Sequence, residues 1–253
     1  KGDILEITKF LNPQIVIVGE IGAQHIEYFK TLDNIRATKL EALQSSRLQM
    51  AFLHSSTKKE PSQNIEIYDE NLKDINANLD GISFTLDGKN YASSLLGKFN
   101  ATNLAVCIKV ARYLKMSDEA INGALSKMKN VEHRLSKIEA GGKLIIDDSF
   151  NGNFSGMSAS YELVSTYAGR KVLLTPGIVE SDEEQNANLA KVINEIFDLV
   201  IITSSLNAEV LLKHIVKPKI IILKDKNKMQ EILAQNTHAG DLILFSNDAP
   251  SFI

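Results

Sequence analysis

Two residues with chemically useful side chains occur near the start of this 253-residue sequence. His25 follows the apolar run QIVIV, and Lys39 comes 14 residues later in a segment whose apolar residues have helical spacing. From spacing alone, a loop histidine and a solvated helix lysine are the simpler interpretation. Magnesium prefers oxygen ligands, which weighs against His25, and no H-E-x-x-H motif or cysteine cluster indicates zinc. The pair is therefore compatible with two interpretations, which are a surface helix after a strand or half of a phosphate-handling site.

The sequence lacks a phosphate-binding loop of the G-x-x-x-x-G-K-[ST] type. Its two candidates, LGKF at residues 96–99 and GGKL at residues 141–144, have neither the earlier glycine nor the following Ser or Thr. We expect both to be turns. The sequence as given is therefore not expected to bind a nucleoside triphosphate tightly.

Three polar residues could recognise parts of a nucleotide. Asn100 and Asn103 stand at a helix start, where Asn is an ordinary cap, but an amide can also read a base edge. Arg134 follows in EHRLSKIE, near a change in sequence texture. It could form an ion pair between domains or clamp a phosphate with its planar fork of donors.

The segment IIDDSFNGN ends an apolar strand in two acids and an Asn-rich loop. Asx residues are common in turns, so Asp148, Asn151 and Asn153 could simply shape the chain. Acids at a strand end in an α/β sheet can instead bind ribose hydroxyls or orient a cation. The five histidines show no pattern with a serine or the cysteine that indicates a hydrolytic triad.

Apolar periodicity predicts the elements that position these residues in the first half of the sequence. Helical spacing covers residues 3–11 and 31–44. Asp87-Gly88 is a favoured two-residue turn, so a hairpin is expected around it. A helix pair follows, and Ser117 is the expected N-cap of its second helix. Short strands are expected at residues 14–20, 51–54 and 65–68.

Strands and helices alternate after about residue 135, which predicts βα units and a largely parallel sheet. In open α/β sheets ligands bind at the carboxyl ends of the strands, where DDSFNGN and TPGIVES lie. We place the domain boundary between residues 1–134 and 135–253. The expected strands are KLIIDD, KVLLTP, DLVIIT, KIIIL and DLILFS, and the expected helices cover residues 157–168, 182–197, 207–214 and 226–235.

Composition narrows the class of protein. A net charge of -3 with scattered basic residues gives no case for binding nucleic acid. No apolar run approaches the ~18 to 20 residues needed to cross a bilayer, so no membrane insertion is expected. The single Cys107 excludes an internal disulfide and fits a reducing compartment. We expect a cytoplasmic monomer, and a fragment, because Lys1 opens directly into an amphipathic helix.

Four segments occur in an order that resembles the ATP-dependent Mur ligase family. The resemblance covers nearly the whole sequence, and DSFNGN resembles the family's D-S-Y-N-A-N-P loop. TPGIVES resembles a strand-end motif of the branch that joins D-alanyl-D-alanine to UDP-N-acetylmuramoyl-tripeptide. The four segments are IGAQHIEYFKTLDNIRATKLEAL, LLGKFNATNLAV, EHRLSKIEAGGKLIIDDSFNGNFSGM and KVLLTPGIVES.

The resemblance implies catalytic roles for His25, Lys39 and Arg134. His25 matches a histidine that helps to hold magnesium. Lys39 matches a lysine that is carbamylated and so offers the oxygen ligand that magnesium prefers. Arg134 matches an arginine that reaches the nucleotide from the hinge between domains.

The remaining candidates match positions that bind nucleotide or face the substrate cleft. Asn100 and Asn103 match asparagines near the adenine, and Asp148 matches an aspartate near the ribose. Asn151 and Asn153 match the loop that faces the active cleft in this branch.

The sequence also departs from the family pattern. Gly19-Glu20 stand where Thr-Asn is usual, and Phe154 stands where a proline is usual. The ending GDLILFSNDAPSFI lacks the usual Gly-Ser-Arg. These departures bear on the contacts to the incoming dipeptide and leave the order of the motifs intact.

The resemblance implies an α/β fold, with part of a central ATPase domain (a mixed or parallel sheet with helices) followed by a Rossmann-like C-terminal domain. It implies ATP and Mg²⁺ as cofactors, with UDP-MurNAc-tripeptide and D-Ala-D-Ala as partners in peptidoglycan precursor synthesis. The complete enzyme would form an acyl phosphate that the dipeptide amine attacks. The phosphate loop and UDP-sugar domain would precede residue 1, so the fragment alone is expected to be inactive.

Two alternatives remain open. Another ligase of the superfamily, such as a folylpolyglutamate synthase, would share His25, Lys39 and Arg134 but should lack the DSFNGN and TPGIVES pair. A non-catalytic α/β binding domain would need no phosphate loop at all.

Overall fold

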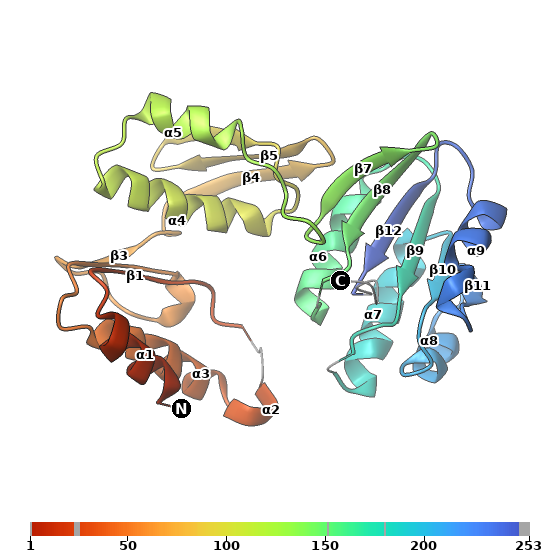
Figure 1. The fold of residues 1–253 in the computed structure, drawn as a ribbon, viewed down its shortest axis with the longest axis horizontal. Coiled ribbons are helices and arrows are strands. Elements are labelled where there is room, and N and C mark those ends of the chain that lie inside the picture. The colour runs from red at the N-terminus through yellow and green to blue at the C-terminus, as the bar shows by residue number, and fades with distance from the viewer. Residues whose placement is uncertain (1, 23–25, 151, 180, 248–253) are drawn as a thin grey trace. The chain divides into compact units, whose positions relative to one another are not determined.

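The computed structural model describes residues 2–22, 26–150, 152–179 and 181–247 and forms two compact units (Figure 1). Unit 2 holds most of the second half of the chain and takes in two short segments of the first half. Unit 1 comprises Lys1–Asn76, Ser83–Ser93 and Phe99–Lys127, and unit 2 comprises Ala77–Ile82, Ser94–Lys98 and Met128–Ile253. No helix of the described residues is long and apolar enough to cross a membrane.

A three-stranded parallel sheet lies at the centre of unit 1. Val16 and Val18 alternate with Ile17, so they share one face of the sheet and pack there with Ile35 and Leu43. The strands are β1 (Ile15–Val18), β2 (Met50–Leu53) and β3 (Ile65–Ile67). The accompanying helices are α1 (Asp3–Leu11), α2 (Ile26–Phe29), α3 (Leu32–Lys39) and the 3₁₀ turns η1 (Leu40–Gln44) and η2 (Ser55–Thr57).

The helix expected over residues 31–44 is an α-helix followed by a 3₁₀ helix. Thr31 caps α3 because its side chain accepts a hydrogen bond from the backbone N–H of Asn34, 3.1 Å away. The α-helix ends at Lys39, and η1 continues the chain. Lys39 therefore occupies the last turn of α3, not the middle of a longer helix.

The remainder of unit 1 is a second sheet with two helices. The expected hairpin is confirmed, because Asp87 and Gly88 connect two strands with φ values of 50° and 75°. Positive φ at both central residues is the requirement of a type I′ turn. Ser117 is confirmed as an N-cap, since its hydroxyl accepts from Ala120 N. The elements are β4 (Leu72–Asn78), β5 (Gly81–Leu86), β6 (Lys89–Ser93), α4 (Phe99–Tyr113) and α5 (Asp118–Leu125).

An ionic cluster ties α4 to strand β3 and to the turn between β5 and β6. The Lys109 ammonium lies 2.7 Å from Glu66 and 2.8 Å from Asp87, and the Arg112 guanidinium lies 3.0 Å from Asp87. Burial alone would lower the pKa of Lys109, but its bonds to Asp87 and Glu66 raise it overall. Lys109 thus stays charged and holds α4, whose N-terminal part carries Asn100 and Asn103, in a fixed place.

A six-stranded sheet forms unit 2, in the order β11-β10-β9-β12-β8-β7. All its paired strands run parallel except β7, which pairs with β8 antiparallel. The five expected strands are confirmed. They are β8 (Lys143–Asp148), β9 (Lys171–Thr175), β10 (Leu199–Ile202), β11 (Lys219–Ile222) and β12 (Leu242–Ser246), with β7 (Ser136–Ala140) beside them.

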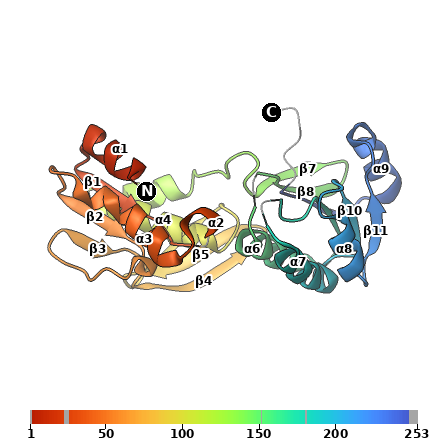
Figure 2. The same cartoon turned by 90° about the horizontal axis from the view of Figure 1, so that it is seen from below.

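Helices cover both faces of this sheet (Figure 2). Met157, Leu189 and Leu211 from three helices pack on one face, while Met229 and Leu233 pack on the other. Both faces are apolar because a parallel sheet is buried on both sides. The helices are α6 (Phe154–Ser165), α7 (Glu183–Ile196) and α8 (Ala208–His214) on the first face, and α9 (Met229–Asn236), preceded by η3 (Lys226–Lys228), on the second.

Candidate functional site

Residues 133–135 form a turn in unit 2 that is held by the end of β8 and by the segment following it. The Nδ1 atom of His133 lies 2.8 Å from the Asp147 carboxylate and 3.2 Å from the Ser149 hydroxyl. The backbone N–H of Phe150 donates to the carbonyl oxygen of His133 at 3.2 Å. The turn is therefore attached to the carboxyl end of a central strand, where ligands bind in open α/β sheets.

Arg134 is presented at the surface of this turn. Its guanidinium carbon lies 4.1 Å from the centroid of the Phe150 ring, a cation–π geometry. The flanking residues His133 and Leu135 have φ values of 61° and 50°, which non-glycine residues adopt at a cost of about 1–3 kcal/mol each. Its charge acts on the nearby Asp148 carboxylate.

Asp148 lies on the opposite side of β8 from Asp147, because successive strand residues alternate in direction. The Ser160 hydroxyl donates to its carboxylate, and the Leu135 N–H and Arg134 charge also favour its ionised form. Burial outweighs these three effects and raises the pKa of Asp148 above its usual range. A half-buried carboxylate beside an exposed arginine could accept hydrogen bonds from ligand hydroxyls.

The loop after β8 begins α6. Asn153 caps this helix, since its Oδ1 accepts from the backbone N–H of Gly156 at 2.9 Å. Asn153 therefore has a structural role at the start of α6, and its expected position facing the substrate cleft stays a prediction. Asn151 lies outside the described residues.

Asparagine side chains join the other loops at this edge of the sheet. Asn186 is fully buried, and its amide accepts from Ile178 N at 2.9 Å and donates to Ile178 O at 3.2 Å. Asn247 donates to Gly177 O at 2.7 Å and accepts from Gly152 N at 2.6 Å. The loops after β8 and β9 and the end of β12 are therefore fixed to one another.

The candidates in unit 1 lie on two helices. Asn100 and Asn103 are the second and fifth residues of α4, and Asn103 Nδ2 donates to Asn100 Oδ1 at 3.1 Å. Lys39 is exposed at the last position of α3. His25 lies outside the described residues.

The donors of unit 1 fit magnesium only as part of a ligand set. The described residues contain no group of three or more His, Cys, Asp or Glu side chains that could hold a metal. Magnesium takes oxygen ligands, which a lysine amine lacks. The exposed Lys39 amine would supply oxygen once carbamylated, so it fits as one ligand whose partners come from elsewhere.

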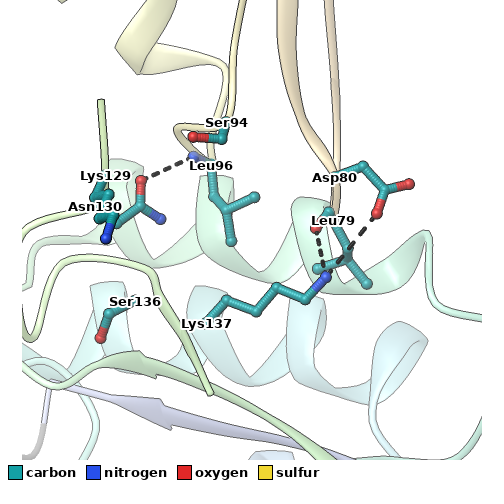
Figure 3. A pocket seen from close by; sticks show the side chains of 8 residues that line it. All are labelled: Leu79, Asp80, Ser94, Leu96, Lys129, Asn130, Ser136 and Lys137. Atoms are coloured by element: carbon teal, nitrogen blue, oxygen red, sulfur yellow. Dashed lines mark hydrogen bonds and ion pairs between the residues drawn. The ribbon is translucent and has the colours of Figure 1, made fainter. Parts of the chain in front are cut away.

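A cavity of about 440 Å³ also lies within unit 2 (Figure 3). The Lys137 ammonium points to Leu79 O, 3.2 Å away, and Asn130 Oδ1 accepts from Leu96 N at 3.1 Å. None of the site residues expected from the sequence lines it. Because these polar groups already bond to the protein, the cavity offers a ligand few partners. We therefore place the candidate site at the carboxyl edge of the sheet and not in this cavity.

The structure brings Arg134 and Asp148 together in unit 2, and Asn100 and Asn103 together in unit 1. Sequence reasoning missed three residues that hold the unit 2 turn, namely His133, Asp147 and Phe150. The two adjacent acids of DDSF were the available signal. Successive side chains of a strand point to opposite faces of the sheet, so Asp147 and Asp148 lie on different faces and each needs a separate partner.

Comparison with known proteins shows which family the chain resembles. Residues 2–111 match the model of the Mur ligase middle domain. The chain is 26% identical, over 269 aligned positions that cover 97% of it, to the UDP-N-acetylmuramoyl-tripeptide–D-alanyl-D-alanine ligase of Bacillus subtilis. Residues 2–111 thus match a Mur ligase middle domain, and the chain is similar to a Mur ligase over nearly its whole length.

Solved structures of Mur ligases share the fold. MurF ligase from Thermotoga maritima in complex with ADP is 24% identical with a TM-score of 0.81, and 98% of the chain is covered. The corresponding ligase from Acinetobacter baumannii is 21% identical with a TM-score of 0.84, again over 98% of the chain. The expected α/β fold, a Mur ligase middle domain followed by a C-terminal α/β domain, is confirmed.

The chain spans about three fifths of the length of these Mur ligases. It covers 58% of the Bacillus subtilis ligase, 61% of the Thermotoga maritima structure and 58% of the Acinetobacter baumannii structure.

Gly177→Ala is expected to destabilise unit 2 by more than 1 kcal/mol. A Cβ atom there would lie 2.5 Å from Asn186 Oδ1, and the φ of +79° is unfavourable for alanine. Gly156→Ala is the matched control, because its Cβ meets no atom closer than 3.5 Å and alanine favours a helix. Denaturant unfolding measures both, and equal stabilities of the two variants would contradict the account.

Asp148→Asn is expected to change the dependence of stability on pH. Since the folded pKa of Asp148 is raised, the folded state binds its proton more tightly, and this contribution to stability is lost as pH rises from about 4 through the folded pKa. The Asn variant cannot ionise, so its stability relative to the natural protein should increase over that interval. Unfolding free energies at a series of pH values test this, and a constant difference would refute the buried-carboxylate assignment.

Proposed function

We propose that the complete protein is an ATP-dependent peptide ligase of peptidoglycan precursor synthesis that joins D-alanyl-D-alanine to UDP-N-acetylmuramoyl-tripeptide. The observation that carries this proposal is the alignment of 97% of the chain with a ligase of that printed activity. The DSFNGN and TPGIVES motifs support this branch over another ligase of the superfamily, and their described residues Gly152 and Gly177 are both bonded to Asn247 at one edge of the unit 2 sheet.

The proposed reaction has two steps. The γ-phosphate of ATP passes to the terminal carboxylate of the tripeptide, giving an acyl phosphate and ADP. The amine of D-Ala-D-Ala then attacks the acyl carbon, and phosphate leaves from a tetrahedral intermediate. Both steps depend on positioning and charge neutralisation more than on covalent chemistry by the protein. The proposed enzyme would act in the cytoplasm, because it uses ATP and a UDP-linked substrate.

Unit 2 would contact the nucleotide through Arg134 and Asp148. The planar guanidinium of Arg134 matches the geometry of phosphate oxygens, and its stacking on Phe150 limits the rotamers it must lose on binding. Asp148 would accept hydrogen bonds from the ribose. Asn151 and Asn153 would lie in the loop that faces the incoming dipeptide.

Unit 1 would supply the remaining contacts. Asn100 and Asn103 would lie near the adenine, where their amides offer both donors and acceptors. His25 and the Lys39 carbamate would provide magnesium ligands, and bound magnesium would neutralise charge on the transferring phosphate. In this proposal residues 1–134 belong to the ATP-binding domain and residues 135–253 form the C-terminal domain.

The proposal is tested in the natural polypeptide that contains this sequence. With ATP, UDP-MurNAc-tripeptide and D-Ala-D-Ala, mass spectrometry should detect the pentapeptide product together with ADP. Absence of product, or ligation of glutamate to a folate instead, would overturn it.

Lys39→Ala in that polypeptide is expected to lower kcat by at least 100-fold, because a carbamate ligand is removed, and an added small carboxylate should restore part of the activity. Lys9→Ala removes another exposed helix lysine and is the control. Full activity of Lys39→Ala would show that the lysine has no such role.

A further inference from the structure

A second cluster of polar residues lies at the carboxyl edge of the unit 1 sheet and has no role in the proposal so far. It gathers the segments that follow β1, β2 and β3. Ser56 lies at its centre: its hydroxyl accepts from Ile21 N at 2.8 Å, and its carbonyl oxygen accepts from Arg36 Nε at 3.0 Å. One residue thus joins the segment after β1 to helix α3.

Ser56 is held in turn by His54. The Ser56 backbone N–H donates to His54 Nδ1 at 3.1 Å, and the Ser56 hydroxyl lies 2.9 Å from the same nitrogen. A backbone N–H can only donate, so Nδ1 is an acceptor and the imidazole proton is on Nε2. Because Nδ1 is an acceptor, the Ser56 hydroxyl donates its proton to His54, and the hydroxyl oxygen accepts from the Ile21 N–H.

Asp69 completes the chain from the end of β3. Its carboxylate lies 3.2 Å from His54 Nε2, and it accepts from Ser55 N at 2.8 Å and from the Ser55 hydroxyl at 2.6 Å. The side chains of His54 and Asp69 are only 14% and 13% exposed, and the Tyr68 ring packs edge-on against His54. Water competes little for these bonds, so the chain is a rigid connection.

The position of this chain indicates its use. Parallel strands end together at the edge where α/β sheets bind ligands. Arg36, which Ser56 holds, precedes Lys39 by three residues, so both lie within about one turn of α3. Apolar side chains could fill the same space. The Asp69–His54–Ser56 chain does more, because its hydrogen bonds fix the orientation of Ser56 as well as its position.

We propose that Ser56, oriented by His54 and Asp69, is a positioning residue that fixes α3, and with it the Lys39 amine, against the segment following β1. This inference rests on the proposed ligase function. It assigns Ser56 no contact with substrate. Loss of its hydroxyl should misplace one proposed magnesium ligand while leaving the nucleotide contacts of unit 2 intact.

The test compares Ser56→Ala, Ser56→Thr and Ser62→Ala in the natural full-length polypeptide. Ser56→Ala should lower kcat at saturating ATP about tenfold and weaken Mn²⁺ binding, followed by electron paramagnetic resonance, by a similar factor, with little change in the KM for ATP. Ser56→Thr keeps the hydroxyl and should retain both properties. Ser62→Ala removes a loop hydroxyl that bonds only to Asn64 among the described residues, and should behave as the natural protein.

Natural kcat and Mn²⁺ affinity in Ser56→Ala would overturn the inference, as would a Ser56→Thr variant as impaired as Ser56→Ala. Hydrogen exchange separates this outcome from failure of the proposed function, because it needs no activity. Ser56→Ala should speed exchange of the Ile21 amide and of the α3 amides. Unchanged exchange at both places would overturn the inference even in an active ligase.

Discussion

The attachment of the turn at residues 133–135 to the end of β8 is the constraint on which the candidate site depends. Asp147 holds His133 from one side of the strand, while Asp148 receives the Leu135 N–H from the other. Phe150 supports Arg134 between them. Two non-glycine residues in left-handed conformations are stable here because these contacts repay their strain.

The two units use different physical means to fix their loops. In unit 2 uncharged amides, above all the buried Asn186, join the strand-end loops. In unit 1 charged and ionisable groups dominate, through the Lys109 cluster and the Asp69–His54–Ser56 chain. Parallel strands explain why the amide network of unit 2 and the Asp69–His54–Ser56 chain of unit 1 both occur at strand ends, since the loops that carry these polar residues emerge at the same edge of each sheet.

Apolar runs such as DLVIIT predicted the central strands of unit 2 because strands buried on both faces are apolar throughout. The same reasoning missed β4 and β7, whose residues are mostly exposed and polar. It also missed His133 with Asp147, since 14 residues separate them and only the folded turn makes them neighbours. The resemblance to Mur ligases and the fold were predictable. The roles of the site residues stay predictions, with His25 and Asn151 outside the described part of the chain.

The central claim is that residues 133–135 and 147–150 form a nucleotide-binding surface. The most direct measurement is hydrogen exchange of the natural full-length polypeptide with and without ADP, followed by mass spectrometry of its peptides. The account predicts slower exchange in both segments when ADP is bound, because the turn and the strand end would be ordered by the ligand. Bound ADP, verified by calorimetry, with unchanged exchange in both segments would contradict it.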